Sequence, residues 1–171
     1  GVSTEAMSMM NLTAYRPVII NALLLEIVTG NALIVRSEDS TGIHRVLYST
    51  WDYCVRRDIK GNPVEVVYRD IRRYGDMSEK EAEGIHRSVA DEDEKFTQYT
   101  LYELKNGKWH WEQSIEKAVI GSGSWTIEDN PLTVLAWSLA RGDNYGRGLV
   151  EAESTAFHNI DILTEARNDM I

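Results

Sequence analysis

The stretch Trp137–Glu151, WSLARGDNYGRGLVE, constrains the possible fold more strongly than any other part of the sequence. An apolar run, Leu132–Trp137, ends here in the loop Arg141–Gly148, which holds three glycines and an Asp-Asn pair. Because Gly and Asn adopt positive φ at little cost, this composition predicts a turn. The sequence before the loop is rich in strand-like alternation, and the sequence after it favours a helix. We therefore expect a β-rich unit between two helical segments.

The N-terminal segment, Ser3–Gly30, is expected to form the first helix. Met, Leu, Ala and Ile dominate it, and these residues favour helix. Pro17 predicts a kink or a new helix start, and Gly30-Asn31 predicts a positive-φ C-cap. Val18–Val28 is apolar on most faces, so this helix needs neighbours all round. Those neighbours are either the core of its own domain or copies of itself in a ring.

Two segments alternate between apolar and polar residues and predict antiparallel strands. In Asn31–Tyr74 the strands are expected at residues 32–36, 43–48, 51–57 and 64–71, joined by short loops. Trp51 is expected on the same strand face as Tyr53 and Val55. In Phe96–Gly121, the dipeptide at 106–107, Asn-Gly, is a strong hairpin signal.

Three further segments follow from local signals. Ser78 and Glu81 form a capping box, which predicts a short helix to about Val89. Gly121–Ser124 is interpreted as a flexible link before the strand that ends at Trp137. Leu149–Ala166 is amphipathic, which predicts a helix of about five turns or more that must pack on the first helix or on another chain.

Together these segments predict an α+β fold, in which two long helices flank a small, mostly antiparallel β-rich unit with one short helix. The expected divisions are residues 1–31 for the first helical segment, 32–140 for the β-rich domain, and 141–171 for the loop and second helical segment. Since the sequence begins at Gly1 without methionine and stops in mid-helical pattern, we expect it to be a piece of a longer protein.

Charge and residue usage exclude several classes of function. The net charge of −9 disfavours general attraction to nucleic acid, although residues 31–75 hold eight basic and six acidic residues. The single cysteine, Cys54, excludes an internal disulfide and a cysteine zinc cluster. No run is long enough to span a membrane.

The residues offer little for catalysis or for metal binding. The four histidines are scattered through different predicted elements, and none has a second ligand at metal spacing. No nucleophile motif surrounds Cys54, and the glycines of the 141–148 loop fit no nucleotide-binding motif. We therefore expect no catalytic residue, no metal and no cofactor. One alternative stays open, in which this loop holds an anion at the start of the second helix with Arg147 assisting.

The order of these pieces resembles the portal, or head-to-tail connector, proteins of short-tailed phages. LEIVTGNALIV at 25–35 and HRVLYSTWDYCVRRDIKGNPVEVVYRD at 44–70 match the helix, strand and hairpin of that family, and the Trp137–Glu151 stretch matches its later loop and helix start. The resemblance covers roughly residues 18–166. The residues that carry it are Gly30, Asn31, Gly61, Asn62, Trp137, Asp143, Tyr145, Gly146, Arg147 and Glu151. The acidic run at 91–94 and the Trp-rich hairpin match no motif of the family.

The resemblance implies a structural, non-enzymatic virion protein. In this family two stem helices flank a clip domain, and the subunits form a dodecameric ring at the capsid vertex. Double-stranded DNA passes through the ring without sequence specificity during packaging and ejection. The expected partners are copies of the chain itself, the terminase large subunit, which carries the ATPase, and the tail adaptor. The expected location is the virion, and the host cytoplasm during assembly, without membrane contact.

Two other interpretations remain open from the residues alone. One is an independent enzyme domain that binds a small molecule or phosphoester, for which the glycine-rich loop and five tryptophans are the best support. The other is a different adaptor or tail structural protein of a phage.

Overall fold

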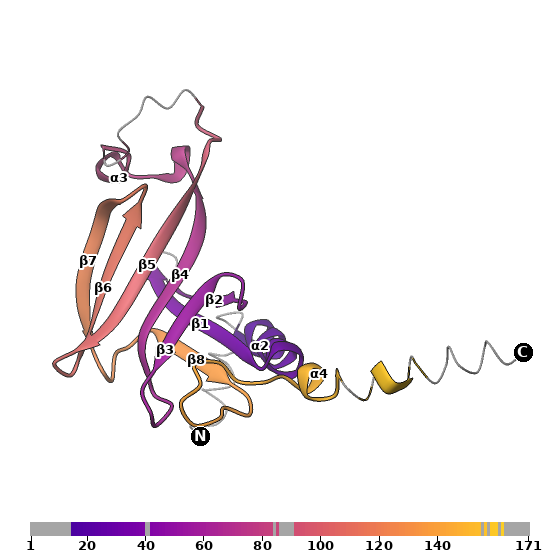
Figure 1. Cartoon of the computed structure of the whole chain (residues 1–171). Helices are drawn as coiled ribbons and strands as arrows, with labels where there is room; N and C mark the ends of the chain where they lie inside the picture. The colour runs from indigo at the N-terminus through magenta and orange to yellow at the C-terminus, as the bar shows by residue number, and fades with distance from the viewer. Residues whose placement is uncertain are drawn as a thin grey trace, which may run out of the picture.

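The computed structural model describes residues 15–39, 42–83, 85, 91–154, 156, 158–160 and 162 (Figure 1). The helices and strands, in chain order, are α2 (Tyr15–Thr29), β1 (Asn31–Asp39), β2 (Gly42–Tyr48), β3 (Tyr53–Arg57), β4 (Pro63–Arg73), α3 (Glu79–Glu83), β5 (Lys95–Lys105), β6 (Lys108–Ile115), β7 (Ala118–Thr126), β8 (Leu132–Ala136) and α4 (Leu149–Ala152). A short 3-10 helix, Tyr74–Asp76, follows β4. The mixed α+β composition agrees with the expectation from sequence.

The strands form two antiparallel sheets. The first has the order β2-β1-β8, and the second has the order β3-β4-β5-β6-β7. The chain leaves the first sheet after β2, builds the whole second sheet as a meander, and returns as β8 to the free edge of β1. There Asn31 pairs with Ala136 and Val35 pairs with Leu132. The segment 31–74 is thus divided between two sheets.

The two sheets pack face to face around the main core. In β4, Val66 and Tyr68 point into this core, whereas Val67 and Arg69 point to the outer face, as strand alternation requires. The buried members of the core are Leu33, Val35, Tyr48, Tyr53, Val55, Val66, Tyr68, Tyr102, Trp109 and Leu132.

α2 covers the other face of the three-stranded sheet. Ala22 is fully buried there against Ala32 and Ile34 of β1. Leu33 and Val35, which alternate with them, face the five-stranded sheet. β1 is apolar at successive positions because it is buried on both sides. The layers therefore run from α2 through the three-stranded sheet to the five-stranded sheet (Figure 1).

The strongest local signals of the sequence are confirmed. Asn106 and Gly107 have φ of 51° and 74° in the turn that joins β5 to β6. Ser78 caps α3, because its N–H donates to the Glu81 carboxylate at 2.7 Å while its hydroxyl accepts the Glu81 N–H at 3.4 Å. The expected continuation of this helix to Val89 lies outside the described residues.

Two predictions in the β-rich part are wrong. Gly121–Ser124 is not a link but the centre of β7. A Cβ at Gly123 would lie 2.7 Å from Nε1 of Trp111, so the glycine leaves room for the indole ring on the strand. Trp51 does not share a face with Tyr53, because β3 begins at Tyr53 and the Trp51 side chain is 84% exposed in the preceding turn.

The expectation of two long helices is also wrong for the described residues, where α2 is the only helix of seven residues or more. α4 contacts α2 but spans only Leu149–Ala152. Leu149, Val150 and Ile160 are about half-exposed, so this chain supplies little of the packing that stabilises a long helix. The expected helix before residue 15 lies outside the described part. No described helix is both long and apolar enough to span a membrane.

Candidate functional site

The loop between β8 and α4 returns to the end of α2, and these two segments form the candidate site. Gly30, which follows α2, has a φ of 76° and donates its N–H to the carbonyl of Glu26 at 2.9 Å. This is the expected glycine C-cap. A Cβ at Gly30 would also lie 2.5 Å from backbone atoms of Arg147 and Gly148. Glycine is therefore required here by both the backbone conformation and the close approach of the loop.

Asn31 joins the start of β1 to the same loop. Its side chain donates to the Gly146 carbonyl at 2.8 Å and accepts the Gly146 N–H at 2.7 Å. It also donates to the Thr29 carbonyl at 2.7 Å. Asn31 is only 4% exposed, so its amide replaces water for two backbone groups that lie 115 residues further along the chain.

Backbone contacts complete this site, which we call the glycine junction (Gly30, Asn31, Trp137, Gly146, Arg147 and Gly148). Trp137 donates its N–H to the Gly30 carbonyl at 2.7 Å and accepts the Arg147 N–H at 2.9 Å. A Cβ at Gly146 would overlap the backbone of Trp137, and one at Gly148 would overlap the last turn of α2. The loop thus packs backbone against backbone, which explains its glycines.

The same loop covers the free edge of β3. Asn144 accepts the Arg57 N–H through Oδ1 at 2.8 Å, and the Tyr145 hydroxyl accepts the Val55 N–H at 3.1 Å. The Arg57 guanidinium donates back to the Asn144 carbonyl at 3.0 Å and to the Gly61 carbonyl at 2.8 Å. These contacts hold the end of the five-stranded sheet against the junction.

The ionisable groups beside the junction are suited to packing rather than to proton transfer. Burial raises the pKa of the Tyr53 phenol, whose ring centroid lies 6.3 Å from that of Tyr145. Burial likewise raises the pKa of Tyr145 and lowers the pKa of Arg57. A phenol with a raised pKa stays protonated at neutral pH and is a poor general base.

The structure brings together about half of the residues that carry the family resemblance. Five of them meet at the junction: Gly30, Asn31, Trp137, Gly146 and Arg147. Three lie nearby, namely Tyr145 on the β3 edge and Gly61 and Asn62 in the β3–β4 turn. Asp143 lies in the loop between β8 and α4, and Glu151 lies in α4; neither contributes to these contacts.

Three residues that contribute to the junction or to its contacts with β3 were not singled out from the sequence, namely Gly148, Asn144 and Arg57. Gly148 could have been suspected, because it is one of three glycines in the loop. No sequence signal pairs Asn144 with the edge of a strand that lies 87 residues earlier.

The junction also bears on the anion-binding alternative for this loop. The N–H of Gly146 is bonded to Asn31, and the N–H of Arg147 is bonded to Trp137. These donors are therefore occupied within the chain. α4, with four residues, is also too short to act as an anion site at its N-terminus.

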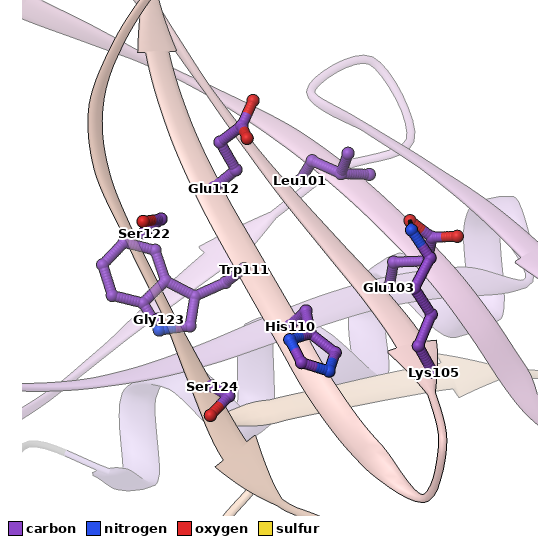
Figure 2. A pocket seen from close by; sticks show the side chains of 9 residues that line it. All are labelled: Leu101, Glu103, Lys105, His110, Trp111, Glu112, Ser122, Gly123 and Ser124. Atoms are coloured by element: carbon purple, nitrogen blue, oxygen red, sulfur yellow. Dashed lines mark ion pairs between the residues drawn. The ribbon is translucent and has the colours of Figure 1, made fainter.

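An open hollow of about 430 Å³ lies elsewhere, on the outer face of β5, β6 and β7 (Figure 2). Its charged side chains include Glu103, Lys105 and Glu112, with His110 between them along the strands. Lys105 pairs with Glu103 at 2.6 Å. Among the described residues, no cluster of three or more His, Cys, Asp or Glu side chains could hold a metal ion. Ser124 lies opposite His110 in the β6–β7 ladder, and His110 lies opposite Glu103, but among these described residues no hydrogen bond joins the His110 ring to either side chain.

The comparisons with known proteins agree with the family resemblance that the sequence motifs indicated. A family model described as bacteriophage head to tail connecting protein matches residues 1–171. The portal protein of Pseudomonas phage phiKMV is 30% identical over 158 residues, which cover 86% of this chain and 30% of that protein. The portal protein of Enterobacteria phage SP6 is 26% identical over 171 residues, covering 96% of this chain and 33% of that protein.

A third relative has the same coverage pattern. The portal protein of Escherichia phage T7 is 26% identical over 161 residues, which cover 90% of this chain and 30% of that protein. The chain thus spans about a third of the length of these curated relatives.

Proposed function

Because the chain belongs to the bacteriophage head-to-tail connecting protein family, a structural and non-enzymatic family, we propose that it forms part of a portal subunit. The subunits form a closed ring, a dodecamer, at the capsid vertex. The ring is the conduit for double-stranded DNA during packaging and ejection. It is also the docking site for the terminase large subunit and the tail adaptor.

One observation carries the assembly part of this proposal: a stripe of apolar residues on α2 that the described chain leaves uncovered. We call it the α2 stripe, and its members are Ile20, Leu23, Leu24, Ile27 and Val28. They recur at helical spacing and are 42% to 55% exposed. A contiguous apolar surface of this kind marks a protein–protein interface, because water contact is unfavourable for it.

The glycine junction supports the same proposal from the side of geometry. A ring closes only if every subunit repeats one contact at one angle. Gly30, Asn31 and Gly146 fix the end of α2 against the start of β1 and the end of β8 by direct hydrogen bonds. α2 is thereby held at a set angle to the sheets. On this proposal residues 1–31 and 141–171 belong to the stem and residues 32–140 to the clip.

The charges are compatible with a conduit that does not hold DNA. The net charge is −9, so the chain as a whole exerts no attraction on phosphate. Several of the basic residues in 31–75 are neutralised within the chain, since Arg56 pairs with Glu65 at 2.8 Å and Arg72 lies 3.7 Å from Glu81. Because the chain does not attract phosphate, DNA can slide through the ring without being held.

The test is a charge placed in the α2 stripe. Leu24 is 55% exposed, so Leu24→Asp should leave the fold intact and prevent association. We expect a loss of the assembled species in sedimentation velocity, with an unchanged near-ultraviolet circular dichroism spectrum from the tryptophan-rich sheets. Ile59→Asp, at a 65% exposed position outside the stripe, is the matched control and should assemble normally. If Leu24→Asp assembles as the control does, the stripe is not an interface.

A further inference from the structure

We propose that the α2 stripe of one subunit docks on the outer face of the five-stranded sheet of the next subunit. The docking surface is an apolar patch, which we call the outer patch, formed by Trp51, Val67, Ile71 and Tyr99. This inference rests on the proposed function, because it names the surface that receives the stripe when the ring closes.

Three of the four residues of the outer patch are exposed although they are large and apolar, and Val67 is half-buried between them. Trp51 is 84% exposed, Ile71 is 71% exposed and Tyr99 is 49% exposed. Val66 and Tyr68 of β4 and Gln98 and Thr100 of β5 are buried. Strand alternation therefore places Val67, Ile71 and Tyr99 on the face opposite to the core. An apolar surface gathered on one sheet face is an interaction site rather than a scatter of single exposed residues.

The outer patch contains a hollow that fits a helix side chain. The hollow has a volume of about 120 Å³, and Trp51, Cys54, Val67 and Tyr99 are among its lining residues. Apolar cavities of about 150 Å³ accept a molecule the size of benzene. The hollow therefore has room for one aliphatic side chain, such as Leu24 of a neighbouring copy.

The charged groups next to the two surfaces are few, and the arginines of β4 beside the outer patch are already paired within the chain. Glu26 is the one charged residue between Val18 and Val28, and it is not part of the stripe. On the sheet, Arg69 pairs with Asp52 at 3.2 Å and Arg73 lies 3.6 Å from Asp93. Docking of the helix would therefore not remove an unpaired one of these charges from water, which would cost free energy.

The two surfaces lie at opposite ends of the layered fold. α2 forms one outer layer, and the outer patch is on the far side of the other outer layer, with the three-stranded sheet between them (Figure 1). A contact that joins unlike surfaces is head-to-tail and can continue from subunit to subunit until a ring closes. A contact of the α2 stripe with the same stripe of another copy would be two-fold symmetric and would stop at a dimer.

The lone cysteine provides a direct test. Cys54 is a free, exposed thiol in the hollow of the outer patch. Single cysteines are introduced along the stripe, as Ile20→Cys, Leu23→Cys and Leu24→Cys, and the protein is treated with a short bismaleimide. We expect at least one variant to give a ladder of dimers, trimers and larger species in denaturing electrophoresis. Ser124→Cys, exposed on β7 outside the patch, is the matched control and should give no ladder.

Removal of the native thiol makes the test decisive. Adding Cys54→Ser to a laddering variant should abolish every crosslink, whereas a dimer that survives would be an α2–α2 contact and would overturn the inference. Sedimentation of the uncrosslinked protein separates the two proposals. A ring that gives no crosslink to Cys54 refutes this docking but leaves the proposed ring, and a monomer at every concentration refutes both the docking and the ring.

A second variant probes the patch without new cysteines. Trp51→Ala should weaken association by at least tenfold, because truncating an exposed aromatic that becomes buried at an interface removes a large contact area. The midpoint of urea unfolding should not change, since Trp51 is 84% exposed in one subunit. An association constant within twofold of the starting protein would overturn the proposed patch.

Discussion

Asn31→Ala is the substitution that most directly probes the glycine junction. The Asn31 side chain is 4% exposed and makes hydrogen bonds of 2.7 and 2.8 Å to the two backbone groups of Gly146. Alanine leaves both groups without these partners in a buried site. It also removes the bond from the side chain to the Thr29 carbonyl.

The expected loss of stability follows from these contacts. A buried polar group left without a partner costs about 1–3 kcal/mol, so two such groups predict a loss of about 2–6 kcal/mol. That is a large share of the roughly 5–15 kcal/mol by which a domain of ordinary stability resists unfolding. Because α2, β1 and β8 meet here, we expect the loss to affect the entire fold.

Urea unfolding followed by tryptophan fluorescence measures this loss. Asn62→Ala is the matched control, because Asn62 is exposed and bonds to Asp58 within a single turn. It should cost less than about 1 kcal/mol, as exposed hydrogen bonds do. If Asn31→Ala costs no more than the control, the junction does not hold the helix to the sheets.

Three further outcomes are expected. Gly146→Ala should prevent folding or cost several kcal/mol in urea unfolding, because its Cβ would overlap the Trp137 backbone. In the control Gly142→Ala the new Cβ meets no atom within 4 Å, so this variant should cost only about 1 kcal/mol for its positive φ. Trp137 is 45% exposed, so Trp137→Ala should cost about 1–2 kcal/mol in the same assay, rather than the roughly 3–5 kcal/mol of a buried aromatic. A loss above about 2 kcal/mol would mean that the indole ring is covered. The pKa of the Asp58 carboxyl is lowered mainly by the hydrogen bond that it accepts from the Asn62 side chain. The stabilisation of the folded state by this carboxylate is therefore present above the unfolded pKa and is lost as the pH falls through the folded pKa. Asn62→Ala should raise the Asp58 pKa in an NMR titration, and an unchanged value would contradict this cause.

The parts of the fold that depend on neighbouring residues could be predicted from the sequence. Asn106-Gly107 specifies its hairpin because both residues adopt positive φ, and Ser78 with Glu81 specifies a helix start. The glycines of the loop before α4 also predicted a turn at the correct place. Signals of this kind act within a few residues, so distant packing does not change them.

The parts that depend on distant residues could not be predicted. Gly121 and Gly123 look like a link in sequence, but Trp111 on the adjacent strand occupies the space that their missing side chains leave. The return of β8 to β1, and with it the meeting of Asn31 with Gly146, has no local signal. Among the described residues the second helix is shorter than expected, because an amphipathic pattern does not say whether a partner is present to cover it.

The most direct test of the central claim is the mass and symmetry of the assembled protein, from native mass spectrometry together with electron microscopy. The α2 stripe is uncovered in the described chain, and the glycine junction holds α2 at one angle to the sheets. We therefore expect a closed ring of identical subunits with α2 at the contacts between neighbours, and the proposed portal function implies that this ring is a dodecamer. A monomer or a two-fold dimer at every concentration would contradict the account.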